Sequence, residues 1–270
     1  YFKAQAYGRE IVDTMFLAYK YDIGRKYESY GLKSIIKAEG LEKLDRTFYE
    51  AGTIKDHYQN PVEWAKIKQY AEEDGDDALT LFDLMAPALF YFTQSIPKPF
   101  QMMVESATGS QLNSLLVRAY LQDRHSIPKA SEVIQFQGAY SFGLSGIYRN
   151  VFKIDVKSEY PSCILQYKIY DKAKDPKAYF YKMVQFFTEE RFRNKDLAKK
   201  TGDKKYTDIE QAQKIGINSA YGLLNAVGLN FNSPQNAAIV TEKGRETINT
   251  ATIWASGKDV EYWLKEVKNE

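Results

Sequence analysis

Two long helical patterns follow each other in this chain with only a turn between them. Residues 175–200 have helical character that becomes basic towards its end, and a second helical pattern covers residues 208–225. Gly202-Asp203-Lys204 has the composition of a tight turn. Since a short connection brings consecutive helices back alongside each other, the sequence predicts an antiparallel helical hairpin. Its tip is basic: Lys199, Lys200, Lys204 and Lys205.

The rest of the chain adds more helices and one strand. Helical spacing of apolar residues is found at residues 30–38, at 62–84 with a break expected at Gly75, at 109–123, and at 241–268 with a weak point at Gly257. Residues 138–145, rich in glycine and aromatic residues, predict a hairpin or loop, and Val151–Ile154 predicts a short strand. The expected fold is therefore helix-rich and of the mixed α/β (α+β) class.

Composition sets limits without naming a function. Lys and Arg total 37 against 35 Asp and Glu, so nucleic-acid binding would depend on local basic surfaces. Cys163 is the single cysteine, which excludes an intramolecular disulfide and favours a reducing compartment. There is no apolar run of about 18 residues and no signal-peptide layout, so neither a membrane span nor secretion is expected. The start at Tyr1, without Met, suggests a piece of a longer protein.

Asp155 is the best metal-ligand candidate in the sequence. It follows the predicted strand, so a rigid element would fix its carboxylate while the next residues turn and offer backbone N–H groups to a phosphate. Carboxylate oxygens are ligands that Mg²⁺ prefers in proteins. The alternative is an aspartate that caps a turn before an ordinary tyrosine.

One helical face gathers polar residues. Lys214, Asn218 and Tyr221 are spaced i, i+4 and i+7, and Gly222 beside them would let a nucleotide or a backbone approach closely. Such a face can meet a nucleotide. The alternative is a solvated lysine next to buried polar and aromatic core residues.

These two sites carry a family resemblance. Ile154-Asp155-Val156-Lys157-Ser158-Glu159-Tyr160-Pro161-Ser162 resembles motif A of the family B DNA polymerases, and Lys214-Ile215-Gly216-Ile217-Asn218-Ser219-Ala220-Tyr221-Gly222 resembles motif B. The order and the separation match the family. Its third palm motif, with a metal-binding Asp-x-Asp, would follow motif B and is absent from this sequence.

The resemblance implies roles for individual residues. Val156 and Lys157 would supply the backbone cradle for phosphate, and Tyr160 would be the steric gate that excludes a 2′-hydroxyl. Lys214 would bind the triphosphate, while Asn218, Tyr221 and Gly222 would line the pocket of the nascent base pair. Arg191 and Lys195, at i and i+4 on the preceding helix, would bind the β and γ phosphates. Glu159 departs from the family, in which leucine is common.

A second candidate site lies near the N-terminus. Tyr70-x3-Asp74 resembles the third motif of the family's 3′-5′ exonuclease, where a tyrosine and an aspartate on successive helical turns position a water and a metal. Asp74 would be catalytic and a metal ligand, and Tyr70 its helper. Asp76 and Asp77 are alternatives.

The family implies an organisation and an activity. Residues 1–105 would end an RNase H-like exonuclease domain, 106–168 would hold the first part of the palm with a partial sheet, 169–229 the two-helix fingers, and 230–270 a return helix to the palm. The parent would be a DNA-directed DNA polymerase that uses Mg²⁺ or Mn²⁺, a primer-template and dNTPs. The alternative is a non-catalytic nucleic-acid-binding module.

Further expectations follow from the same resemblance. The remaining parts of the parent polymerase would be partners of this chain. Its location would be the cytoplasm of a bacterium or of a phage- or virus-infected cell. The chain alone is expected to be inactive and its metal site empty.

Overall fold

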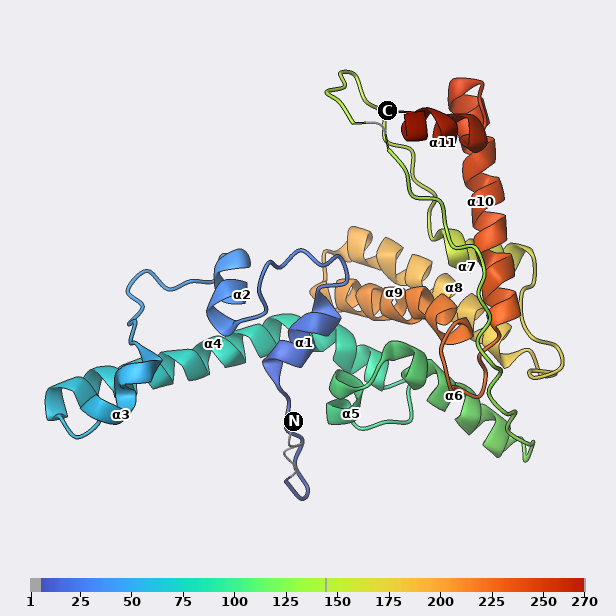
Figure 1. Ribbon diagram of the computed structural model, residues 1–270. Coiled ribbons are helices and arrows are strands. Elements are labelled where there is room, and N and C mark those ends of the chain that lie inside the picture. Colours follow the sequence, from blue (N-terminus) through green and yellow to red (C-terminus); the bar gives the residue numbers. More distant parts are fainter. Residues whose placement is uncertain (1–5, 144, 270) are drawn as a thin grey trace. The chain divides into compact units, whose positions relative to one another are not determined.

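The computed structural model describes residues 6–143 and 145–269, which are predominantly helical (Figure 1). The chain divides into two compact units: Tyr1–Gln94 with Lys98–Ser106, and Ser95–Pro97 with Ala107–Glu270. We call them unit 1 and unit 2. No helix in the described ranges is long and apolar enough to cross a membrane.

Unit 1 is built on one long helix, α4 (Pro61–Thr93). This helix begins where the sequence favours a start, because the Asn60 side chain accepts a hydrogen bond from the Val62 N–H and Pro61 occupies the first helical position. Four short helices accompany it: α1 (Thr14–Tyr21), α2 (Leu32–Ala38), α3 (Ile54–His57) and α5 (Phe100–Glu105), with a 3₁₀ turn at Ala51–Thr53. Leu17, Ile35, Leu81, Met85 and Phe92 form its core.

The predicted break at Gly75 is wrong. Helix α4 continues through Gly75 and also contains Pro87. A glycine inside a helix costs only about 1 kcal/mol relative to alanine. Burial of Ile67 before the glycine, and of Leu81 and Met85 after it, outweighs that cost.

Unit 2 contains the helical hairpin, and this prediction is confirmed. Helices α8 (Tyr179–Thr201) and α9 (Lys204–Leu224) lie side by side (Figure 1). Gly202 ends α8 in the left-handed conformation (φ 69°), and the Asp203 side chain caps α9 by accepting from the Lys205 N–H. Helix α6 (Thr108–Gln122) packs against α9, and α7 (Glu159–Gln166) packs against α8, α9 and α10 (Pro234–Ser256).

The C-terminal helical pattern is confirmed, with its weak point. Helix α10 ends before Gly257, which has φ 69°, and α11 (Val260–Asn269) follows. The helix begins earlier than expected because Pro234 is a favourable first residue. The Trp263 indole N–H donates to Ser256 Oγ at 3.0 Å and joins α11 to the end of α10.

The expected partial palm sheet is not found in the described residues. Val151–Ile154 are extended but form no strand, and the only β interaction there is an isolated bridge between Ala6 and Arg9. A strand is stabilised by hydrogen bonds to a neighbouring strand, and no described segment pairs with this one. Val151 and Phe152 are accordingly exposed. The β-prone sequence favoured an extended backbone without specifying a partner.

Candidate functional site

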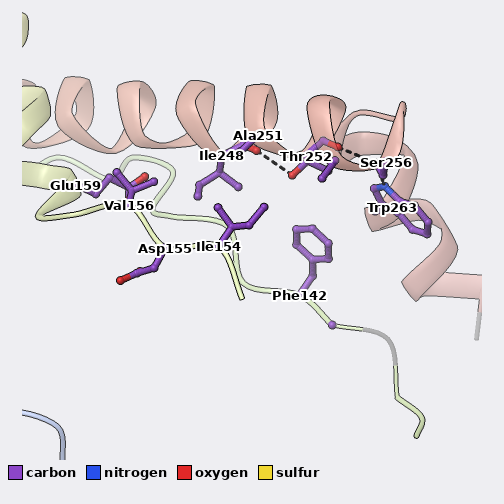
Figure 2. A pocket seen from close by; sticks show the side chains of 12 residues that line it. Phe142, Ile154, Asp155, Val156, Glu159, Ile248, Ala251, Thr252, Ser256 and Trp263 are labelled. Atoms are coloured by element: carbon purple, nitrogen blue, oxygen red, sulfur yellow. Dashed lines mark hydrogen bonds between the residues drawn. The ribbon is translucent and has the colours of Figure 1, made fainter. Parts of the chain in front are cut away.

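Asp155 lies where the extended segment meets α7. Its carboxylate is exposed, and it makes no hydrogen bond or ion pair with any other described residue. In Figure 2 the side chain is directed away from α10. Beside it is a cavity of about 480 Å³ whose wall includes Ile154, Glu159, Ile248, Thr252 and Trp263. The loop residue Asp155 and the helix α10 thus border one hollow.

The turn into α7 has an unusual backbone. Ser158 adopts the left-handed conformation (φ 52°, ψ 51°), which costs a residue with a side chain roughly 1–2 kcal/mol. Arg191 on α8 donates from Nη1 to Ser158 Oγ at 2.8 Å. The hairpin therefore holds the turn that follows Asp155.

Glu159, the departure from the family motif, is the first residue of α7. Its Oε1 atom is buried and has no hydrogen-bond partner in the described structure. Burial raises the pKa of this carboxyl, and the nearby charge of Asp155 raises it further. A Cβ built on Gly244 of α10 would lie 3.4 Å from Oε1, which is an ordinary van der Waals contact, so an alanine would fit here whereas a larger side chain would meet this carboxyl.

The two motif tyrosines meet. The rings of Tyr160 on α7 and Tyr221 on α9 have centroids 4.6 Å apart and an interplanar angle of 47°. Burial raises the pKa of both phenols, so both are neutral hydrogen-bonding groups at pH 7. Gly222, next to Tyr221, has open space where a Cβ would be. Residues from two strings about sixty positions apart in sequence therefore lie against each other.

The predicted phosphate-binding cations differ in their surroundings. Lys157 lies over the Phe192 ring, with Nζ 3.8 Å from the centroid. Arg191 is ion-paired to Glu210 of α9, with Nε 2.7 Å from Oε1. Lys195 and Lys214 are half-buried and make no hydrogen bond or ion pair with another described residue. Asn218, one turn beyond Lys214 on α9, is exposed.

The exonuclease-like pair belongs to unit 1 and is surrounded by cations. The Lys33 ammonium donates to the Tyr70 hydroxyl at 2.7 Å and lies 3.9 Å from an Asp74 oxygen. The Arg46 guanidinium, buried at 3% exposure, pairs with both Asp74 and Asp77. The alternative Asp76 pairs with Lys43. Every acid proposed for this site is thus already neutralised by a basic side chain.

These surroundings decide how well a divalent metal fits. Asp155 is an exposed, unpaired carboxylate, which is the donor type that Mg²⁺ prefers, so the residue fits a metal. A metal at Asp74 would have to displace Arg46 and Lys33, so in this arrangement that residue does not fit one. Among the described residues, no group of three or more His, Cys, Asp or Glu side chains is arranged so that it could hold a metal ion.

Sequence reasoning missed several contributors. Glu210 and Ser158 contact Arg191, and Gly244 lies against Glu159. The glutamate is 19 positions from its arginine on another helix, so no single-helix spacing could have revealed the pair. Facing charges on two antiparallel helices are the signal that a hairpin alignment could have used.

Comparison with known proteins shows similarity to DNA polymerases in both sequence and fold. No protein-family model matches the chain. It is 29% identical to DNA polymerase II of Escherichia coli (strain K12) over 158 residues, an alignment that covers 46% of this chain and 19% of that protein. It is also similar in fold to a solved structure, the family B DNA polymerase from the hyperthermophilic archaeon Pyrobaculum calidifontis. That match has a TM-score of 0.74 at 17% identity and covers 94% of this chain and 37% of the other.

The chain spans about a fifth of the curated relative and somewhat more than a third of the solved structure. Both comparisons agree with the family suggested by the two motif strings. The resemblance identified from the sequence is confirmed by both comparisons: the chain is similar to a part of DNA polymerase II in sequence and to a part of a family B DNA polymerase in fold.

Proposed function

We propose that unit 2 forms the dNTP-binding part of a DNA-directed DNA polymerase that transfers a nucleotide to a primer 3′-hydroxyl on a DNA template. The contact between Tyr160 and Tyr221 carries the proposal. It joins the loop of Asp155 to the helix of Lys214, so that a metal-binding carboxylate, a candidate sugar contact and a phosphate-binding cation belong to one site.

Each residue has a distinct task in the proposed reaction. Lys214 and Lys195, which have no acidic partner among the described residues, bind the triphosphate, and the Val156–Lys157 backbone contacts phosphate oxygens. Tyr160 packs under the sugar and excludes a 2′-hydroxyl. Metal ions held in part by Asp155 would neutralise charge on the attacking and leaving oxygens.

Equilibrium binding of dTTP to the 270-residue chain in Mg²⁺ tests this function. Replacing Lys214 by alanine removes a charge-assisted hydrogen bond, so affinity should fall about tenfold, or ~1.4 kcal/mol. Lys205→Ala, at the exposed hairpin tip, is the matched control and should stay within about twofold of the original protein. Equal effects of both changes would refute the assignment of Lys214.

Sugar discrimination tests Tyr160 separately. The original protein should bind dTTP more tightly than the corresponding ribonucleotide, and Tyr160→Ala should reduce that preference. Unchanged discrimination would remove Tyr160 from the gate role.

Proofreading is not included in the proposal, because Asp74 and Tyr70 are held by Lys33 and Arg46 in this arrangement. The alternative function, nucleic-acid binding without catalysis, predicts affinity for a primer-template but no dTTP binding that depends on Lys214. Primer extension by the chain alone is expected to be undetectable. Extension that disappears in Asp155→Ala would refute that expectation.

A further inference from the structure

Arg191 differs from the other proposed phosphate-binding cations in already having an anionic partner. Its Nε donates to Glu210 Oε1 at 2.7 Å, and its Nη1 donates to Ser158 Oγ at 2.8 Å. The side chains of Arg191 and Glu210 are only 12% and 16% exposed. An ion pair so sheltered is screened less by salt than one on the open surface.

A carboxylate and a phosphate group compete for the same face of an arginine. The guanidinium presents its N–H donors in a planar fork that suits the oxygens of either anion. An incoming phosphate that takes the Nε donor must therefore displace Glu210.

The hairpin has other contacts besides this ion pair. Asn194 on α8, buried at 4% exposure, donates to Gln213 Oε1 on α9. The apolar side chains of Phe187 on α8 and Ile217 on α9 are also buried. Neutralising Glu210 should therefore leave the hairpin folded.

We propose that Glu210 is a specificity-determining residue that occupies Arg191 while the site is empty and is exchanged for a phosphate group when a nucleoside triphosphate binds. The inference rests on the proposed dNTP-binding function of unit 2. Only a ligand whose phosphate reaches Arg191 must displace the carboxylate, so Glu210 weakens the binding of triphosphates, leaves the binding of shorter nucleotides unaffected and thereby lowers the preference of the site for a triphosphate. The exchange also changes the contact that holds Ser158, and so links phosphate binding to the turn after Asp155.

The experiment measures dTTP and dTMP affinity for the 270-residue chain and its variants in Mg²⁺. Glu210→Gln should bind dTTP about fivefold more tightly, which is the scale of a partly buried ion pair, while dTMP affinity changes by less than about twofold. Glu189→Gln is the matched control. It removes the same charge from α8 at an exposed glutamate that bonds Gln185, and it should leave both affinities unchanged.

Two more variants separate competition from general charge effects. In an Arg191→Ala background, Glu210→Gln should no longer tighten dTTP binding, since the competing pair is already gone. Glu210→Asp keeps the charge but withdraws it by one methylene, so its affinity should lie between those of the original protein and Glu210→Gln. Far-UV circular dichroism of each variant establishes that the helices are retained.

The possible failures are distinguishable. If dTTP binding depends on Lys214 but Glu210→Gln binds no more tightly than Glu189→Gln, the inference is wrong and the proposed function stands. Weaker binding by Glu210→Gln would mean that the glutamate orients Arg191 for phosphate, which also overturns competition. If no variant shows binding that depends on Lys214, the proposed function and the inference fail together.

Discussion

Removal of the Asp175 carboxylate should unfold the start of the hairpin. The side chain is 2% exposed and accepts three hydrogen bonds: from the Tyr120 hydroxyl at 2.5 Å, the Tyr179 N–H at 2.9 Å and the Phe180 N–H at 2.8 Å. Two of these donors are first-turn N–H groups of α8, which have no acceptor within the helix. In Asp175→Ala all three donors lose this partner, and the hydrogen bonds from Tyr120 and Phe180 are buried while that from Tyr179 is partly buried.

The magnitude follows from the number and burial of these donors. A buried donor without a partner costs about 1–3 kcal/mol, so three of them, after some local relaxation, should lower the free energy of unfolding by about 3–4 kcal/mol. Asp203→Ala is the matched control, because Asp203 also precedes a hairpin helix but is exposed and accepts one bond, from the Lys205 N–H. Loss of that cap should cost only about 1 kcal/mol.

Urea unfolding followed by far-UV circular dichroism measures both variants. Tyr120→Phe removes one of the three donors to Asp175 and should fall between them. If the free energies of unfolding of Asp175→Ala and Asp203→Ala differ by less than about 1 kcal/mol, then burial does not raise the cost of leaving these donors without a partner. Because α8 carries Arg191 and Lys195, a folded Asp175→Ala should also bind dTTP more weakly.

Changes at three other positions test the packing of unit 2. Because the pKa of Glu159 is raised, the native state binds this proton more tightly than the unfolded state does, and stability falls as the pH rises above the ordinary carboxyl pKa. Glu159→Gln should therefore gain stability relative to the original protein as the pH rises above about 4.5, and a difference independent of pH would contradict this. Gly244→Ala should be neutral or stabilising by up to about 1 kcal/mol in thermal unfolding, because alanine favours the helix and its Cβ would lie 3.4 Å from Tyr160 Cε1. Gly244→Leu should instead lower the free energy of unfolding by about 2 kcal/mol or more, because its larger side chain would displace that ring. Asn232→Ala, which removes a fully buried amide bonded to both the N–H and the carbonyl of Ser131, should lower the free energy of unfolding by about 2–3 kcal/mol, and a loss below 1 kcal/mol would show that water replaces the amide.

The sequence predicted local structure better than it predicted contacts between elements. Helix ends were readable where a glycine and a change of period coincide, as at Gly202 and Gly257, whereas the start of α9 was expected at residue 208 and lies at Lys204. The predicted break at Gly75 was wrong because it considered only the low helix propensity of glycine, about 1 kcal/mol, and not the tertiary burial that stabilises the helix on both sides. The prediction of a strand at residues 151–154 was wrong for a related reason, because a strand needs hydrogen bonds to a second extended segment that the local sequence does not specify.

In the candidate site, too, some contacts could be predicted from the sequence and others could not. Family resemblance predicted that Tyr160 and Tyr221 serve one nucleotide, and the rings do lie together, although their roles remain predictions. The pairing of Arg191 with Glu210 depends on how α8 and α9 align, which periodicity within either helix does not specify. Nor does any local pattern distinguish an aspartate held by an arginine, such as Asp74, from one free to bind a metal.

The bond between Trp263 and Ser256 gives the protein an optical reporter. Trp263 lines the same cavity as Asp155, while the other two tryptophans, Trp64 and Trp254, are exposed and absent from its wall. Replacing those two with phenylalanine would leave a single emitter whose indole N–H is bonded at the end of α10. Fluorescence of that variant could then follow events at the cavity directly, without a dye attached to the ligand.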